Sequence, residues 1–395
     1  MSGKPCILII VENLPVPLDR RVWQESCALR DAGYKVVVIC PRMRGFNKPE
    51  EVIEGIHIYR HWISEEASGM LGFISEYTTA LIGEMNLAWK VWERHRPEII
   101  HLCNPPDLLF LVALPFRFLC QTRVIYDVHD VWPEMFEAKF NRRGLLYWAV
   151  RAAEWLTYRT ANIVLATNES VRAIAETRGG KRPEEVYTVR TAPKIVAAEA
   201  EADVSLKCGK KFLVGYVGVM GNVDGVHLLL EAIHHLVVEQ GRADVQFLLM
   251  GTGPEHEALL RQRDSLGLKE CVEMPGRVSD EFLFAALKTM DLGVSSDPIN
   301  GYNDHCTMNK VLEYMAFGKP QVMFELAEGR ASAGEAAAYV PENDPKLLGA
   351  AIGELLDDPG RRKKMGKLGA GRLREHLNWE RSVDQLLKAY RAAGS

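Results

Sequence analysis

Short, unbroken apolar runs alternate with longer amphipathic segments through the first half of the chain. Unbroken runs are typical of strands buried on both faces of a parallel sheet, and apolar positions spaced by three or four residues are typical of helices. We predict strands at residues 6–11, 35–40, 56–60, 99–102, 124–128, 163–166 and 186–189. Helices are predicted at residues 21–32, 70–94 and 145–160. This alternation predicts an open α/β sheet with helices on both faces.

The alternation returns in the second half, after a stretch at 191–211 that is rich in Ala, Glu and Lys and lacks a strand pattern. Strands are predicted at residues 212–218, 245–251, 272–276, 292–295 and 321–324, and helices at 226–239, 258–267, 281–289 and 307–318. The predicted fold is two Rossmann-like, doubly wound parallel-sheet domains that face a central cleft, where the site is expected. The domains are assigned to residues 1–190 and 212–375, with 191–211 as linker. Residues 376–395 are predicted to form a helix that packs back toward the first domain.

Composition narrows the class of protein only slightly. The chain has 395 residues, of which 47% are hydrophobic and 25% charged, which is typical of a globular protein. A net charge of −4 gives no support to nucleic-acid binding. The eight cysteines include no CxxC pair, which favours reduced thiols over disulfides, and no metal-ligand cluster is visible. No leader segment or membrane span is visible in the pattern. We therefore expect a cytoplasmic protein that needs no metal.

The helix predicted at 307–318 carries polar side chains near its start, where free N–H groups and the helix dipole attract anions. Asn309, Lys310 and Glu313 lie within its first turns. A lysine is disfavoured there by the dipole unless a phosphate lies in front of the helix. The alternative is an ordinary salt bridge between Lys310 and Glu313, three residues apart, and the spacing does not decide between the two.

Two glycine-containing turns follow strands of the second domain. Gly215, Gly218 and Gly221 form a GxxGxxG pattern in the first, and GTGPE at 251–255 forms the second. Glycines allow backbone N–H groups to approach a pyrophosphate closely, although a tight connection between strand and helix explains the first turn about as well.

Asp127, His129 and Asp130 stand at the end of the strand at 124–128. Carboxylates beside an imidazole can orient it and shift its pKa for work as a base or hydrogen-bond donor. A single histidine is more often structural, but its place at the carboxyl end of a strand favours a functional interpretation.

The segment 139–159 is basic and has an apolar stripe. Its basic residues are Lys139, Arg142, Arg143, Arg151 and Arg159, and its stripe is Leu145, Trp148, Ala152, Trp155 and Leu156. This composition is typical of a helix that lies on an anionic membrane surface. The alternative, slightly favoured for the stripe itself, is a helix whose apolar face packs on the sheet.

Several segments together resemble glycosyltransferases of family 4, which have the GT-B fold. They are DRRVWQE at 19–25, YDVHDVWPE at 126–134, GYVGVMG at 215–221, PGRVSD at 275–280, NKVLEYMAFGKP at 309–320, EGRASAG at 328–334 and NWE at 378–380. The resemblance implies retaining transfer from a nucleotide-sugar, UDP- or GDP-linked, held by the second domain. The acceptor, a saccharide or a lipid-linked molecule, would be held by the first domain, in surface-polysaccharide or glycolipid synthesis. A peripheral position on the inner face of the cell membrane would fit such a role.

The resemblance also implies roles for individual residues. Glu313 matches the second glutamate of the E-x7-E motif, which binds the donor ribose, whereas His305 stands in the place of the first. The Arg and Lys contacts to the diphosphate after the GYVG turn are absent, and Lys310 and Arg330 are candidates to replace them. Asp304 or Asn303 would contact the sugar. The implied donor-binding set is Gly218, Gly221, Arg277, Asn309, Lys310, Glu313, Arg330 and Gly334, and the implied catalytic set is His129, Asp130 and Asp304.

Two other functions remain open. A nucleotide-sugar epimerase has the same fold, and a partner protein that has lost activity would explain the departures from the motif. A nicotinamide dehydrogenase is disfavoured because the first βα turn has no glycines.

Overall fold

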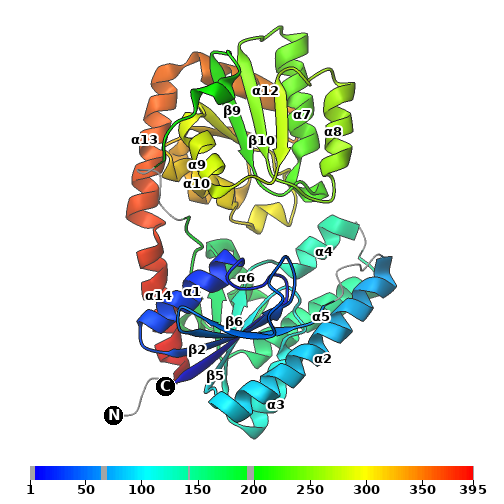
Figure 1. The fold of residues 1–395 in the computed structure, drawn as a ribbon, viewed down its shortest axis with the longest axis vertical. Coiled ribbons are helices and arrows are strands. Elements are labelled where there is room, and N and C mark those ends of the chain that lie inside the picture. The colour runs from blue at the N-terminus through cyan, green and yellow to red at the C-terminus, as the bar shows by residue number, and fades with distance from the viewer. Residues whose placement is uncertain (1–4, 64–68, 141–142, 194–199, 395) are drawn as a thin grey trace. The chain divides into compact units, whose positions relative to one another are not determined.

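The structure is a computed structural model that describes residues 5–63, 69–140, 143–193 and 200–394, without the side chains of residues 69–77. The chain divides into two compact units (Figure 1). Unit 1 contains Met1–Thr191 and Glu380–Ser395, and unit 2 contains Ala192–Trp379. Each unit is described by itself below.

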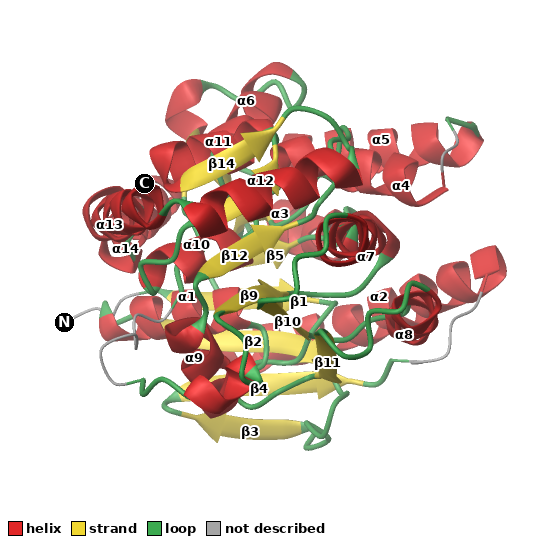
Figure 2. Cartoon of the chain, turned by 90° about the horizontal axis from the view of Figure 1, so that it is seen from above, coloured by secondary structure: helices red, strands yellow, loops and turns green. Residues whose placement is uncertain are grey.

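Unit 1 is built on a sheet with the strand order β3-β4-β2-β1-β5-β6-β7-β8 among the described residues. The first five of these strands, from β3 to β5, are labelled in Figure 2. All neighbouring pairs are parallel except β3 with β4. The strands are β1 (Cys6–Val11), β2 (Lys35–Pro41), β3 (Glu50–Ile53), β4 (Ile56–His61), β5 (Ile99–Cys103), β6 (Arg123–Val128), β7 (Ile163–Ala166) and β8 (Val186–Thr188). The central strands are fully buried because helices cover both faces, which explains their unbroken apolar runs.

The helices of unit 1 lie on two sides of this sheet. On one side, α2 (Gly69–His95) and α3 (Phe110–Leu119) share a core with β1, β2 and β5, and α5 (Leu145–Thr160) packs beside α3. On the other side lie α1 (Arg20–Asp31) and α14 (Trp379–Gly394). The remaining helices are α4 (Trp132–Phe140) and α6 (Glu169–Thr177).

Unit 2 has a second parallel sheet, with the order β11-β10-β9-β12-β13-β14 among its described residues. The strands are β9 (Phe212–Val217), β10 (Val245–Met250), β11 (Val272–Gly276), β12 (Leu292–Ser295), β13 (Gln321–Phe324) and β14 (Ala337–Val340). The helices are α7 (Val226–His234), α8 (His256–Ser265), α9 (Asp280–Thr289), α10 (Asn309–Ala316), α11 (Ala327–Ala333), α12 (Pro345–Asp357) and α13 (Pro359–His376). The sheet is doubly wound, and the reversal of strand order places the carboxyl ends of β9 and β12 side by side.

The two-sheet α/β fold is confirmed, whereas several elements differ from the prediction. The edge strands β3 and β14 and helices α3, α4, α6, α11, α12 and α13 were not predicted. Helix α10 begins at Asn309, two residues after the predicted start, and α7 ends at His234, after which His235–Glu239 forms a π-helical turn. In the predicted linker, Val204–Lys207 forms a 3-10 turn, and residues 194–199 lie outside the described part. Among the described residues, no helix meets the length and hydropathy needed to cross a membrane.

The predicted packing of the apolar stripe of α5 on the sheet is wrong. Leu145, Trp148, Ala152, Trp155 and Leu156 are all exposed, and the opposite side of the helix, with Val150, Ala153 and Tyr158, is the buried one. Arg142 of the predicted basic set lies outside the described residues.

Candidate active site

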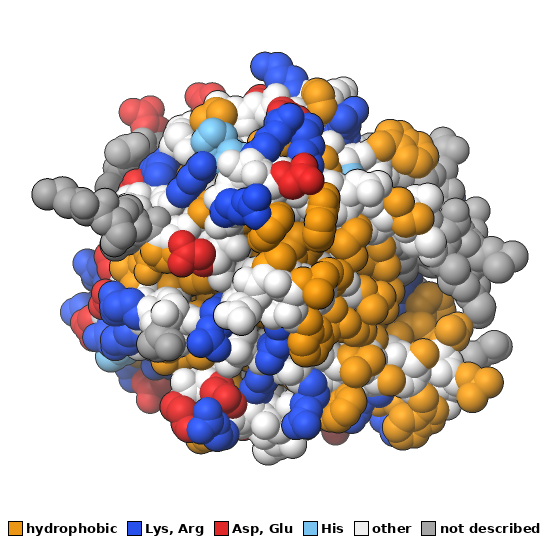
Figure 3. All heavy atoms as spheres, turned by 90° about the horizontal axis from the view of Figure 1, so that it is seen from below, with side chains coloured by type: hydrophobic (Ala, Val, Ile, Leu, Met, Phe, Trp, Pro, Cys, Tyr) orange, Lys and Arg blue, Asp and Glu red, His pale blue; other side chains and the backbone are white. Residues whose placement is uncertain are grey.

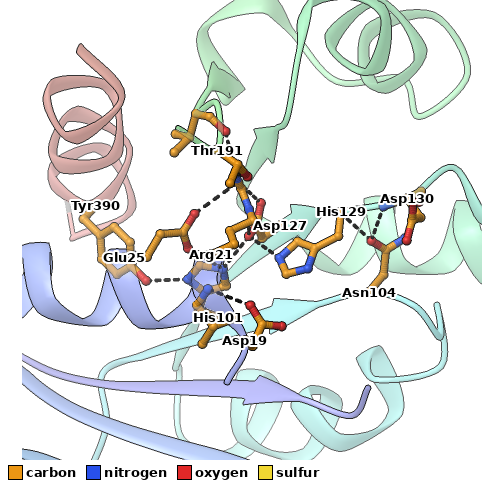
Figure 4. Close-up of polar contacts among 12 residues, drawn as sticks. Asp19, Arg21, Glu25, His101, Asn104, Asp127, His129, Asp130, Thr191 and Tyr390 are labelled. Atoms are coloured by element: carbon orange, nitrogen blue, oxygen red, sulfur yellow. Dashed lines mark hydrogen bonds and ion pairs between the residues drawn. The ribbon is translucent and has the colours of Figure 1, made fainter. Parts of the chain in front are cut away.

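A buried ion pair connects α1 to the carboxyl end of β6 in unit 1. The Arg21 guanidinium donates to both carboxylate oxygens of Asp127, from Nε at 2.9 Å and from Nη2 at 2.6 Å (Figure 4). Its Nη1 donates to the carbonyl oxygen of Val189 at 2.7 Å. Asp127 is fully buried, so the bidentate contact is made away from water, where such pairs are strong and geometrically specific.

Asp127 in turn holds the imidazole of His129. His129 Nε2 lies 2.7 Å from Asp127 Oδ2, and the imidazole Nδ1 makes no hydrogen bond to the residues that the structure describes. Because an ionised carboxylate can only accept, Nε2 carries a proton and Nδ1 is left to meet a ligand. The side chain of His129 is 15% exposed, which leaves it in contact with solvent at the end of the strand.

The charges of this cluster shift one another's pKa values. Burial alone would raise the pKa of Asp127, but Arg21 and His129 outweigh it and hold that pKa well below the usual value. Burial opposes protonation of His129, but the Asp127 carboxylate prevails and raises the pKa of His129. For Glu25, burial dominates the favourable charge of Arg21 and raises the pKa to about 7. The arrangement therefore favours a protonated imidazole that can donate from Nδ1.

Asn104 fixes the backbone that carries His129. Its Oδ1 accepts from the N–H of His129 at 2.7 Å and from that of Asp130 at 3.2 Å, and its Nδ2 donates to the carbonyl oxygen of Asp130 at 2.7 Å. Sequence analysis placed two carboxylates beside the imidazole. In the structure the carboxylate that bonds the ring is that of Asp127, and Asp130 joins the cluster through its backbone.

The last helix also reaches this cluster. The hydroxyl of Tyr390, on α14, lies 2.6 Å from Nδ1 of His101, and Nε2 of His101 lies 3.5 Å from Asp127 Oδ2. His101 is fully buried on β5, so α14 takes part in the environment of Asp127 through one intermediate side chain.

One group of side chains here could by distance hold a metal ion, which sequence analysis did not predict. Ligand atoms of His101, Cys103 and Asp127 lie within 4.8 Å of one another. The group does not fit a bound cation, because Asp127 already accepts two hydrogen bonds from the Arg21 guanidinium and burial raises the pKa of the Cys103 thiol well above its usual value.

In unit 2, Lys310 is buried at the start of α10. Its Nζ donates to both oxygens of Asp297, at 2.8 and 2.9 Å, and lies 4.8 Å from the centre of the Tyr216 ring. Burial lowers the pKa of Lys310, but Asp297 outweighs this and raises it. The nearby Asp224 has a pKa raised to about 6, first by burial and then by Asp297, with Lys310 opposing. The ammonium thus forms an ion pair with a carboxylate beyond the end of β12, an arrangement that neither sequence-based interpretation of Lys310 included.

The glycines of the first turn of unit 2 have a packing reason. A Cβ at Gly218 would lie 2.9 Å from the Tyr216 hydroxyl and 3.0 Å from Lys310 Cε. The Gly218 N–H donates to Met250 O, and that of Gly221 donates to Asp224 Oδ2 at 3.0 Å. A diphosphate could therefore use either amide only by displacing its present acceptor, and the predicted pyrophosphate contact stays a prediction.

The other predicted residues of unit 2 are spread over the loops at the carboxyl ends of β11, β12 and β13. Asp304 Oδ1 accepts from the N–H of Ala327, so this carboxylate caps the first turn of α11. Asn303 is buried, and its Nδ2 donates to the carbonyls of Val223 and Pro298. These two hydrogen bonds hold the loop after β12 to the backbone around it, and the predicted sugar contact of Asn303 stays a prediction.

Five more residues complete the predicted donor-binding set: Arg330, Asn309, Arg277, Gly334 and Glu313. Arg330 is half-exposed on α11, donates to Glu325 and lies 4.1 Å from the Tyr339 ring centre. Asn309 is exposed at the start of α10, and Arg277 is exposed in the turn after β11. Gly334 has a φ of 55° at the end of α11, a conformation that favours glycine, and Glu313 is partly buried on α10.

Sequence reasoning missed Arg21, Asn104, Asp297 and Tyr390 as parts of these clusters. Arg21 lies in the DRRVWQE segment that carried the family resemblance, and Asp297 lies two residues after the predicted strand at 292–295. Asn104 directly follows β5, which pairs in parallel with β6, so it lies beside the end of β6; no strand order had been predicted that would have placed it there.

Two doubly wound α/β units, each with its polar residues at the carboxyl ends of the strands, define the GT-B class of fold. The chain belongs to the glycosyltransferases of the family 4 type. Residues 18–190 match the family described as "Glycosyl transferase 4-like domain", and residues 211–358 match "Glycosyl transferases group 1".

The chain is similar to individual proteins at low sequence identity. It is 28% identical over 205 residues to MMP alpha-(1->4)-mannosyltransferase of Mycolicibacterium hassiacum, a match that covers 50% of this chain and 43% of that relative. Sucrose-phosphate synthase from Thermosynechococcus elongatus has a similar structure, with a TM-score of 0.80 at 17% identity over 99% of this chain and 100% of that one. Anabaena HepE in complex with UDP-glucose gives a TM-score of 0.74 at 16% identity, over 98% of this chain and 100% of that one. These structural similarities concern the fold.

Proposed function

We propose that this protein transfers a sugar from a nucleotide-sugar donor to a saccharide or lipid-linked acceptor, with retention of configuration at the anomeric carbon. The observation that carries the proposal is the Arg21–Asp127–His129 chain, which holds an imidazole with a raised pKa at the end of β6 in a chain of the glycosyltransferase family. A uridine-linked donor is supported by Anabaena HepE, which was crystallised with UDP-glucose. A guanosine-linked donor is the alternative.

In the proposed reaction, the bond between the anomeric carbon and the diphosphate oxygen breaks while the acceptor hydroxyl forms its bond on the same face of the sugar. The hydroxyl proton leaves to the departing diphosphate, so the products are a glycoside and a nucleoside diphosphate. His129 would donate from Nδ1 to the transferred sugar or the acceptor. Lys310 and Arg330 would stabilise the negative charge that develops on the diphosphate, and Glu313 would bind the donor ribose.

The ion pair in unit 2 sets a condition on this role of Lys310. Its ammonium already binds Asp297 at 2.8 Å, so an arriving diphosphate would share or replace that partner. A site of this kind keeps the lysine charged and placed before the donor binds, because burial without a counter-ion would favour loss of its proton. Two charge partners for one ammonium are compatible when each accepts a different N–H.

We place this activity in the synthesis of surface polysaccharide or glycolipid, in the cytoplasm or at the inner face of the cell membrane. Support comes from the exposed apolar and basic side chains of unit 1, which would bring the protein to a lipid-linked acceptor.

The test begins with a thermal-shift screen of nucleotide-sugars, since a ligand that binds only the folded state raises its apparent stability. Release of nucleotide is then measured with and without a panel of saccharide acceptors. Acceptor-dependent release supports a transferase. Conversion of the donor without an acceptor would indicate an epimerase, and donor binding without turnover would indicate an inactive relative.

Variants assign the roles. His129→Ala should lower kcat by about two orders of magnitude or more with little change in donor affinity, whereas His376→Ala, at an exposed position of α13, should leave both unchanged. Lys310→Met combined with Asp297→Asn removes both buried charges together and so limits the damage to folding. Donor affinity that stays at the wild-type value in this double variant and in Arg330→Ala would overturn the proposed diphosphate contacts.

A further inference from the structure

Large apolar side chains are exposed mainly in unit 1. On α5, the outward stripe includes Leu145 at 91%, Trp148 at 62% and Trp155 at 51% exposure. Among the described residues of unit 2, none of the exposed large hydrophobic side chains is aromatic. Exposed tryptophans at helical spacing are costly in water, so this distribution indicates a surface that is covered in use.

The stripe of α5 continues over its neighbours. Helix α3 packs against both α2 and α5, and it exposes Phe118 and Leu119 at its end, at 74% and 76%. On α2, Ile82 and Trp89 are exposed, and the Trp89 ring lies 5.5 Å from that of Phe116 on α3. We call this surface, made of Ile82, Trp89, Phe118, Leu119, Trp148 and Trp155, the α2/α3/α5 face. Hydrophobic side chains gather in one broad area with Lys and Arg side chains nearby when the molecule is seen from below (Figure 3).

A cationic cavity lies next to Phe118 and Leu119. Its lining consists of Arg117, Gln121, Thr122, Arg123 and Asn162 and contains no acid, and its volume is about 290 Å³. Within the described part of the chain, Nη1 of Arg117 is buried and has no hydrogen-bond partner. A buried guanidinium N–H without an acceptor is costly, which points to an acceptor that arrives with a ligand.

Positive charge accumulates around this cavity. Burial lowers the pKa of Arg117, and the neighbouring Arg123 lowers it further. Lys181, which donates to the carbonyl of Ala161 beside the cavity, has a pKa lowered by burial and, against the pull of Glu185, also by Arg117 and Arg159. Cations that repel one another across a cavity of this volume favour an anion such as a phosphate group.

We propose that the α2/α3/α5 face docks on an anionic lipid bilayer and that the cavity between Arg117 and Arg123 receives a lipid phosphate. Tryptophans with arginines beside them match the interface region of a bilayer, where an apolar ring can enter the acyl layer while charges stay among the headgroups. Phe118 and Leu119 directly follow Arg117 in the chain, so the phosphate contact and the apolar contact would form at the same helix end. The proposal rests on the membrane location proposed above, for which it names the surface and the phosphate site, but it does not depend on the sugar-transfer reaction.

The test is flotation of the full chain with vesicles of phosphatidylcholine alone and with phosphatidylglycerol added, without any nucleotide-sugar. Wild-type protein should float with the anionic vesicles, less so at high salt because exposed charges are screened, and should stay behind with the neutral ones. Because no donor is present, failure of this experiment leaves the proposed transferase activity untouched, and failure of the transferase assay leaves the docking surface untouched.

Two pairs of variants separate the apolar and the charged contributions. Phe118→Ser with Leu119→Ser should abolish flotation, whereas the matched Leu347→Ser with Leu368→Ser, exposed positions on α12 and α13, should leave it unchanged. Arg123→Gln, at an exposed position, should weaken binding to anionic vesicles about fivefold, and Arg117→Gln with Arg123→Gln roughly 25-fold. Arg361→Gln with Lys363→Gln on α13 is the charge control.

The thermal unfolding of each variant is measured as well, because a loss of flotation supports the proposal only when the variant is as stable as the wild type. Wild-type protein that ignores anionic vesicles would overturn it. So would equal losses in the Leu347/Leu368 and Phe118/Leu119 variants. Self-association that the Phe118/Leu119 variant dissolves, in protein that does not float, would identify the face as an interface between protein chains and would also overturn it.

Discussion

Replacement of Arg21 by glutamine tests whether the buried cluster of unit 1 is held by charge. The change removes a guanidinium that makes bidentate contact with Asp127 and lies 3.1 Å from Glu25. Both carboxylates are fully buried, so neither can be compensated by water. Loss of one partner of a buried pair costs about 3–5 kcal/mol, because the remaining charge stays without compensation.

The expected effect is large enough to see in thermal unfolding. For a unit of this size, each kcal/mol lowers Tm by about 2–4 °C, so Arg21→Gln should lower the transition of unit 1 by roughly 6–20 °C. Differential scanning calorimetry is the suitable assay because two units can unfold in separate transitions. A second readout is the His129 pKa by NMR, which should change because the guanidinium contributes to it directly and through Asp127.

The same helix offers a matched control. Arg30 also binds two acids, Asp31 and Glu54, but its side chain is 28% exposed and both partners lie in solvent. Arg30→Gln should therefore cost less than about 1 kcal/mol. If Arg21→Gln and Arg30→Gln lower Tm equally, the argument from burial is refuted. Asp127→Asn combined with Arg21→Gln should recover part of the loss, because no buried charge is then left unpaired at that contact.

Two further predictions concern pH and backbone packing. The pKa of Glu25 is raised from 4.5 to about 7 on folding, so the folded state binds this proton more tightly and unit 1 should lose stability as pH rises from about 5 to 8, with the raised pKa of His129 adding to the loss. Glu25→Gln should flatten this decline in Tm, and an unchanged slope would show that Glu25 titrates normally. In unit 2, Gly251→Ala should lower the free energy of unfolding by about 3 kcal/mol or more, because the φ of Gly251 is 139° and the new Cβ would lie 1.7 Å from Gly218 O. The control Gly241→Ala, with a φ of 70° and no atom within 4 Å, should lower it by only about 1 kcal/mol, and equal losses in chemical denaturation would contradict the close approach of the two turns.

Most of the fold was accessible from the sequence because its determinants are local. Strand β1 is buried along its whole length and β2 at every residue except its first, Lys35, so their apolar runs stand out from the helix between them. Strand β3 was missed because it is a short, half-exposed edge strand without such a run. Helix α3 was missed because Pro115 interrupts its apolar pattern, although the helix continues past it.

The candidate site was predictable only in part. His129 and Asp127 were recognisable because they lie two residues apart at a strand end, whereas the Arg21–Asp127 contact joins residues 106 positions apart.

The stripe of α5 shows a different limit. Periodicity identified it as apolar, but the opposite side of the helix is apolar too, with Val150, Ala153 and Tyr158, so the pattern could not say which side packs.

The hydrogen bond between Tyr390 and His101 has a consequence for how the protein is made. The helix that carries Tyr390 follows the whole of unit 2 in the sequence, so it leaves the ribosome after unit 2, although it belongs to unit 1. While unit 2 is being translated, His101 of unit 1 therefore lacks the Tyr390 hydroxyl as its hydrogen-bond partner. Folding of the buried cluster around Asp127 is thus completed only after α14 has been synthesised, and until then the nascent chain leaves the partners of α14, such as His101, uncovered on that side.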